Sequence, residues 1–235
     1  MTEPTNAPFD GDRGVEPDPV PVLYRGVLAL KMDRHRVPAI LATIERYPPH
    51  LRAAADAARI RVALIGPFQD YPDYSPALRA QGFSDPDVRL AGLFVSHERT
   101  LYVRAPSPVI VAHEYAHALD LALGGGSYLS HDHPGIRRAY RAARAARRTV
   151  VRYAATALTE YFAEGMRAMA EVNDERSPWP RVSRARLKLV DPALYEILEA
   201  LFASRPTVAD TPRRKPARLD PGRRRYSGRV PLRPA

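Results

Sequence analysis

The spacing of apolar and polar residues predicts strands early in the chain and helices late. Residues 22–32 alternate as a strand does, and 61–65 form a short β-branched run. Two further strands are predicted at 90–95 and 101–104, joined by a turn at 96–99. Strands that precede the helices, rather than alternating with them, predict an α+β domain with a small mixed or antiparallel sheet and not a doubly wound parallel sheet.

Apolar residues recur at helical spacing in several segments. These are 37–47, 51–60, 108–123, 134–147, 156–172 and 192–202. The helix at 108–123 has the clearest ends: Ser107 can cap it, Pro108 is tolerated in a first turn, and the glycines at 124–126 stop it.

Both ends of the chain lack a hydrophobic period. Residues 1–20 are predicted to be a disordered leader and 204–235 a disordered basic tail rich in Pro and Arg, which leaves 21–203 as one domain. The tail holds ten of the 36 basic and two of the 26 acidic residues, so it carries +8 of the net charge of +10. Binding to nucleic acid is therefore not expected of the domain, and it stays open only for the tail.

Composition excludes several classes of protein. A hydrophobic fraction of 45% and a charged fraction of 26% are typical of a globular domain. Because there is no cysteine, disulfides are impossible and any metal must be bound by His, Asp or Glu. The chain shows neither a signal peptide nor about 18 consecutive apolar residues, so we expect a soluble cytoplasmic protein, with unconventional secretion left open.

The helix at 108–123 contains the sequence His113-Glu114-Tyr115-Ala116-His117. Histidines four residues apart share one helix face and can bind one zinc ion. Glu114 points about 100° away, outside the coordination sphere but within reach of a metal-bound water. The alternative is two unrelated surface histidines. It is disfavoured because the rest of the helix is apolar, and polar groups buried without partners cost several kcal/mol.

A third ligand is required, and two groups of residues could supply it. Glu160 and Glu164 lie four apart on the helix predicted at 156–172, so one can bind the metal while the other holds a histidine through its second ring nitrogen. Taken alone, such a pair is usually a solvated helix face. His131 and His133 compete for the same role, but we expect them near the mouth of the site at most.

These motifs resemble the catalytic domain of anthrax lethal factor and the related Pro-Pro endopeptidases, which are gluzincin metallopeptidases. The matching segments are 111–120 (VAHEYAHALD) and 160–167 (EYFAEGMR), with Tyr153 seven residues before Glu160. The resemblance implies a zincin-like α+β fold and one Zn²⁺ bound by His113, His117 and Glu160. It also implies a catalytic phenol from Tyr153. Glu164 is then the glutamate that holds a histidine through its second ring nitrogen, without binding the metal.

The resulting hypothesis is a zinc metalloendopeptidase that acts on a protein or peptide, with Glu114 as the general base. Tyr161 is the rival phenol, but its place beside Glu160 on a helix favours core packing. Asp120, one turn after His117, suits an outer position behind that histidine or a helix-packing role. The alternative is a regulatory or interaction module whose basic tail binds nucleic acid or an acidic partner and whose metal site is structural or degenerate.

Overall fold

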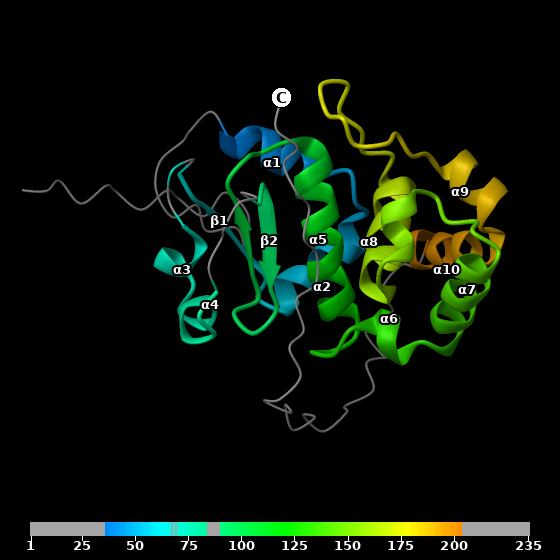
Figure 1. The fold of residues 1–235 in the computed structure, drawn as a ribbon, viewed down its shortest axis with the longest axis horizontal. Coiled ribbons are helices and arrows are strands. Elements are labelled where there is room, and N and C mark those ends of the chain that lie inside the picture. Colours follow the sequence, from blue (N-terminus) through cyan, green and yellow to red (C-terminus); the bar gives the residue numbers. More distant parts are fainter. Residues whose placement is uncertain (1–35, 67, 69, 84–89, 204–235) are drawn as a thin grey trace, which may run out of the picture.

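The computed structural model describes residues 36–66, 68, 70–83 and 90–203, where helices surround a small sheet (Figure 1). The strands are β1 (Arg61–Leu64), β2 (Gly92–Val95) and β3 (Thr100–Val103). In the order β1-β3-β2, β1 runs parallel to β3 and β2 runs antiparallel to it. The α+β class and the predicted β2–β3 pair are confirmed. The strand predicted at 22–32, the leader and the tail lie outside the described residues.

Each predicted helix that falls in the described ranges is present, with ends shifted by up to three residues. They are α1 (Arg36–Ile44), α2 (Pro49–Ala57), α5 (Pro108–Leu123), α7 (Pro134–Ala145), α8 (Leu158–Ala170) and α10 (Pro192–Ala203). Short helices that were not predicted join them: α3 (Tyr71–Tyr74), α4 (Pro76–Ala80), α6 (Leu129–Asp132), the 3₁₀ helix η1 (Arg152–Ala155) and α9 (Arg184–Val190). In the described ranges no helix is long and apolar enough to cross a membrane.

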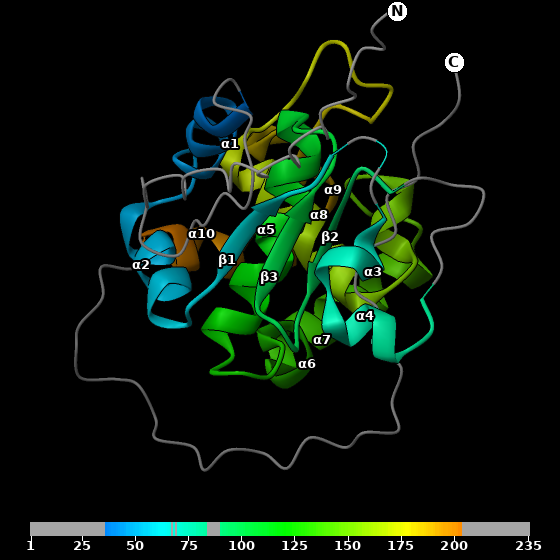
Figure 2. The ribbon, with the colours of Figure 1, turned by 90° about the vertical axis from the view of Figure 1, so that its left-hand side faces the viewer.

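Both faces of the sheet are covered. Alternate residues of a strand point to opposite faces, so neighbouring residues of β3 join different cores. Leu101 and Val103 join the main core with residues of α5, while Tyr102 between them joins a smaller core with Tyr71 and Leu78. Figure 2 shows α5 behind the sheet and α3 and α4 on the other side. The central strands therefore form a buried platform for α5.

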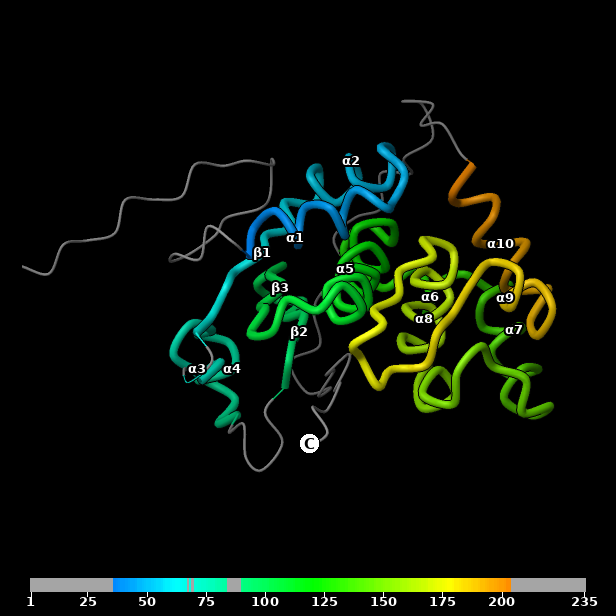
Figure 3. Tube along the Cα trace, turned by 90° about the horizontal axis from the view of Figure 1, so that it is seen from above, coloured from blue at the N-terminus to red at the C-terminus, as the bar shows by residue number. Residues whose placement is uncertain are grey.

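Helix α5 lies between the sheet and α8, and α7 and α10 pack on the far side of α8 (Figures 1 and 3). Gly165 permits the close approach of α10, since a Cβ at this position would lie 2.7 Å from Leu194 Cδ2. The packing leaves α5 and α8 side by side, and both helices carry predicted site residues.

Candidate metal centre

Helix α5 places His113, Glu114 and His117 in the centre of the molecule. Every residue from Val109 to Leu121 is buried. The two histidines lie one turn apart on one face of the helix, with ring centroids 4.8 Å apart. Since buried polar groups without partners destabilise a fold, these side chains need partners from neighbouring elements.

The ends of α5 agree only in part with the sequence interpretation. Pro108 lies in the first turn, and beyond the helix Gly125 and Gly126 take φ angles of +66° and +105°, which favour glycine. Ser107 stands at the N-cap but makes no capping bond with its side chain. Its hydroxyl instead donates to Asp174 Oδ2 at 3.0 Å, which ties the start of α5 to the segment after α8.

Helix α8 brings a carboxylate to the two imidazoles. Glu160 Oε2 lies 3.0 Å from His113 Nε2 and 3.4 Å from His117 Nε2, and the two nitrogens are 3.2 Å apart. The three atoms lie within 4.8 Å of one another. The buried group of His113, His117 and Glu160, the metal group, could hold a metal ion. Glu160 Oε2 makes no contact with hydrogen-bond geometry among the described residues. Converging electron-pair donors of this kind suit a bound cation, because without one or shared protons they repel each other.

Glu164 fixes the other side of the His113 ring. Its Oε1 lies 2.8 Å from His113 Nδ1 and also accepts the indole N–H of Trp179 at 3.1 Å. Its Oε2 accepts two N–H groups of Arg167, at 3.0 Å from Nε and 2.8 Å from Nη2. A carboxylate on Nδ1 orients the ring so that Nε2 faces the group of converging atoms.

The charges of the site are coupled. Burial lowers the pKa of His113, but the carboxylates of Glu160 and Glu164 outweigh burial and raise it to about 10. Burial raises the pKa of Glu164, but His113 and Arg167 outweigh it and lower that pKa to about 2. Burial acts in the same direction on Glu160, whose pKa His117 and His113 hold well below its usual range. A bound cation would take over the role of the proton on His113, since a histidine ligand must be neutral.

The two oxygens of Glu114 have different surroundings. Oε2 accepts the backbone N–H of Phe94 in β2 at 2.9 Å, whereas Oε1 is buried and has no hydrogen-bond partner within the described ranges. Burial raises the pKa of the Glu114 carboxyl, and the nearby His113 and His117 oppose that shift. The carboxylate is thus held at one oxygen and free at the other.

The two candidate phenols, Tyr153 and Tyr161, occupy different places. The Tyr153 ring in η1 lies 5.8 Å from that of His113, and its pKa is raised, first by burial and then by the carboxylates around it, including Glu160. The Tyr161 hydroxyl donates to Asp191 Oδ2 on the far side of α8. Tyr153 therefore lies beside the metal group, and Tyr161 packs in the core.

Other sequence candidates lie outside the group of converging atoms. Asp120 accepts two bonds from Ser130, at 2.7 Å from the backbone N–H and 2.6 Å from the hydroxyl, so it anchors the loop after α5. His117 Nδ1 has no hydrogen-bond partner among the described side chains and backbone, so Asp120 does not hydrogen-bond to this histidine. His133 Nδ1 accepts a backbone N–H in the first turn of α7, and the His131 ring lies 5.6 Å from that of Tyr128.

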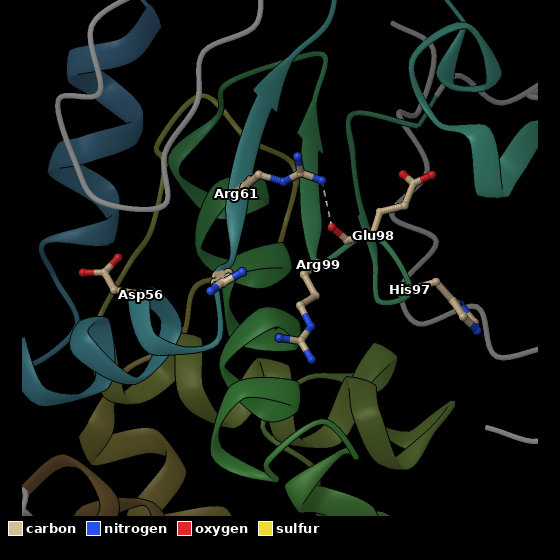
Figure 4. Close-up of a pocket in the computed structure, with 6 residues that line it drawn as sticks. Asp56, Arg61, His97, Glu98 and Arg99 are labelled. Atoms are coloured by element: carbon tan, nitrogen blue, oxygen red, sulfur yellow. Dashed lines mark hydrogen bonds between the residues drawn. The ribbon is translucent and has the colours of Figure 1, made fainter. Parts of the chain in front are cut away.

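A surface hollow at the start of β1 and the β2–β3 turn contains none of these residues (Figure 4). It is lined by Asp56, Arg59, Arg61, His97, Glu98 and Arg99. Arg61 Nη2 donates to the Glu98 carbonyl at 3.2 Å, and Arg99 Nη1 donates to the Ala58 carbonyl at 2.9 Å. Two of its cations thus hold neighbouring backbone, and we assign the hollow no role.

Sequence reasoning missed two residues of the site, Arg167 and Trp179. Arg167 has no exposed side-chain surface and pairs with Glu164 one turn before it on α8. Trp179 lies in the segment between α8 and α9, next to His113 in space. The signals were a cation three residues after a candidate carboxylate and the one tryptophan of the chain, although neither has a characteristic spacing.

The geometry describes an α+β domain with a buried His-His-Glu group between two helices. No family model and no curated protein matches the chain. Solved structures do match, among them the Pro-Pro endopeptidase PPEP-2 from Paenibacillus alvei. Its TM-score is 0.52 at 19% identity, over 75% of this chain and 96% of that one. At this level of identity the match shows a shared fold.

Proposed function

We propose that the chain is a zinc-dependent metalloendopeptidase. The observation that carries the proposal is the buried convergence of His113, His117 and Glu160. Beside it, one carboxylate oxygen of Glu114 has no hydrogen-bond partner among the residues that the structure describes. The fold shared with a Pro-Pro endopeptidase supports the same class of reaction.

The donor atoms favour zinc over harder cations. Two imidazole nitrogens and one carboxylate oxygen form a ligand set typical of catalytic zinc, whereas Ca²⁺ and Mg²⁺ prefer all-oxygen sites. A structural zinc usually takes four ligands from protein, but among the described residues three atoms converge here. Three ligands leave a position open for water or substrate, which favours catalysis over the alternative of an interaction module with a structural metal.

Each residue has a role that follows from its surroundings. When bound, zinc would lower the pKa of water and polarise the scissile carbonyl. Glu114 accepts a proton at Oε1 from the water that attacks the scissile carbonyl, while the Phe94 amide holds Oε2 in place. The phenol of Tyr153, whose ring lies 5.8 Å from that of His113, donates a hydrogen bond to the oxyanion that develops on the substrate.

The substrate class is proteins or peptides. The name of the structural neighbour indicates cleavage at Pro-Pro sequences by that protein, so proline-rich peptides are the first ones to test on this chain.

The test combines metal analysis with cleavage of a peptide library monitored by mass spectrometry. The full chain should contain one zinc ion, should cleave a defined set of library peptides, and should lose this activity on chelation and regain it on zinc addition. A chain that binds no zinc, or that cleaves nothing when loaded with zinc, would contradict the proposal.

A further inference from the structure

Trp179 lies beside the metal group on a segment that the site itself holds in place. Its indole N–H donates to Glu164 Oε1 at 3.1 Å, the same oxygen that lies 2.8 Å from His113 Nδ1. Arg167, paired with Glu164, also donates to the carbonyls of Val172 and Pro180, at 3.1 Å and 3.0 Å. The position of the indole is thus fixed by the residues that orient His113.

The segment carrying Trp179 is also closed upon itself. The Asn173 side chain donates to the Val182 carbonyl and accepts the Val182 N–H, both at 2.9 Å. This pair of bonds joins the two ends of the segment between α8 and α9. A side chain on such a segment loses little conformational freedom when a ligand contacts it, which favours binding.

The indole contacts both apolar side chains and aromatic rings of the site. It packs against the pair formed by Ala91, just before β2, and Ile110, in the first turn of α5. Its ring lies 5.2 Å from that of Tyr153 at an interplanar angle of 73°. The ring is 6.3 Å from that of His113. Because the side chain is only half-buried, part of this apolar surface beside the metal group faces solvent.

The two carboxylates near Trp179 on the same segment already have partners. Asp174 accepts the Ser107 hydroxyl and the Arg176 backbone N–H, each at 3.0 Å, and Glu175 forms an exposed ion pair with Arg181 at 3.1 Å. With both carboxylates engaged, the indole offers an apolar surface to a substrate side chain, and it favours apolar groups.

We propose that Trp179 is a specificity-determining residue that contacts an apolar side chain of the substrate next to the scissile bond. This inference rests on the proposed peptidase function and adds a subsite to it. Glu164 acts here as a positioning residue, since its Oε1 holds both the indole and the His113 ring.

The test uses two zinc-binding probes that differ by one side chain, N-acetylglycine hydroxamate and N-acetylleucine hydroxamate. Both are titrated into the zinc-loaded full chain. Burial of an isobutyl group against an aromatic ring should make the leucine probe bind about tenfold more tightly than the glycine probe. Trp179 is the one tryptophan of the chain, so its emission should shift to shorter wavelength with the leucine probe and much less with the glycine probe.

Substitutions separate a substrate contact from a structural role. Trp179→Ala should reduce the ratio of the two affinities to about one and change zinc affinity less than tenfold, because Glu164 keeps its contacts with His113 and Arg167. Trp179→Phe retains an aromatic face and should keep most of the ratio. Leu189→Ala is the control, at a side chain that is 77% exposed on α9, and should leave the ratio unchanged.

The outcomes distinguish the two proposals. An unchanged ratio in Trp179→Ala and Trp179→Phe, with tight binding of both probes, would overturn the subsite while leaving the metal centre intact. Failure of the wild-type chain to retain zinc or to bind either probe would overturn the peptidase function and the subsite with it. A reduced ratio in Trp179→Ala with zinc retained supports both.

Discussion

Glu114 combines two properties that a general base needs: the Phe94 amide fixes one oxygen, and the other has no hydrogen-bond partner within the described part of the chain. Glu114→Gln retains the size of the side chain and the acceptor for the Phe94 amide but cannot accept a proton. The variant should therefore bind zinc and melt like the wild type but lose nearly all turnover. Zinc analysis, thermal melts and kcat on a library-derived peptide measure these effects. Substantial turnover in Glu114→Gln would exclude Glu114 as the base.

The phenol of Tyr153 is predicted to act in the transition state alone. Tyr153→Phe should retain zinc and substrate affinity but lower kcat by about 10²- to 10³-fold, the usual cost of one oxyanion donor. Tyr161→Phe is the matched control: it loses the hydrogen bond to Asp191, so it should lower thermal stability with little effect on kcat. The reverse pattern in steady-state kinetics would place the catalytic phenol on α8.

Asp120 provides a test of electrostatics through the pH dependence of stability. Burial raises the pKa of Asp120 to about 6, so the folded chain binds this proton more tightly than the unfolded chain. As pH rises from about 4 through 6, the wild type should lose stability relative to Asp120→Asn, by on the order of 2–3 kcal/mol, and the difference should then stay constant. Urea unfolding of both chains in chelator at a series of pH values measures this difference. A difference that does not change with pH would contradict it.

At the scale of elements, β2 and α5 approach closely, and the strand holds Glu114, the proposed general base, through the Phe94 amide. A Cβ at Gly92 would lie 2.7 Å from Ile110 Cγ2 and 3.1 Å from Glu114 Cγ. Gly92→Ala should therefore push β2 away from α5 and lengthen the Phe94–Glu114 bond. We expect a loss of about 1–3 kcal/mol in stability and a larger relative loss in kcat.

The control for Gly92→Ala is a double substitution. Adding Ile110→Ala removes the closer of the two colliding atoms, so the double variant should be more stable than the sum of the single effects predicts. Urea unfolding of the four chains gives the coupling energy. Simple additivity would show that the strand has room to adjust.

The elements predicted most precisely from the sequence are those whose end residues mark where they begin and stop. Helix α5 was located because Pro108 and the glycines after it mark both ends, and the β2–β3 pair because two apolar runs flank a short polar turn. The short helices α3, α4, α6, η1 and α9 have too few residues to show a helical period. Tertiary contacts help to hold them, as when the Tyr71 hydroxyl of α3 donates to the Leu90 carbonyl at 2.7 Å.

The same limit applies to the candidate site. His113, Glu114 and His117 could be grouped from sequence because helix geometry alone fixes how they lie relative to one another. The pairing of α5 with α8 required the resemblance to a known family, since no local pattern states which helices pack together. Trp179 reaches the site through a connecting segment with no period of its own, so only the folded chain places it there.

At the scale of the whole molecule, the metal group joins the two central helices. His113 and His117 lie on α5 and Glu160 on α8, and these helices pack against each other between the sheet on one side and α7 and α10 on the other. Without a cation, the contacts of His113 on α5 with Glu164 at 2.8 Å and with Glu160 at 3.0 Å on α8 still join the two helices. The chain should therefore fold without metal but be less stable.

Zinc removal should lower the melting temperature of the full chain, because a ligand that binds only the folded state adds about 4 kcal/mol at a thousandfold excess over its Kd. His113→Ala, His117→Ala and Glu160→Ala should each lose the single zinc ion and melt at the same temperature with and without chelator.

Glu164→Ala removes a residue that orients His113, not a ligand, so it should bind zinc about 10- to 100-fold more weakly and still gain stability at high zinc concentration. Calorimetry with elemental analysis measures both quantities. Full zinc content in Glu160→Ala would move the third ligand to Glu164 or His133, and complete loss in Glu164→Ala would show that the two glutamates have exchanged roles.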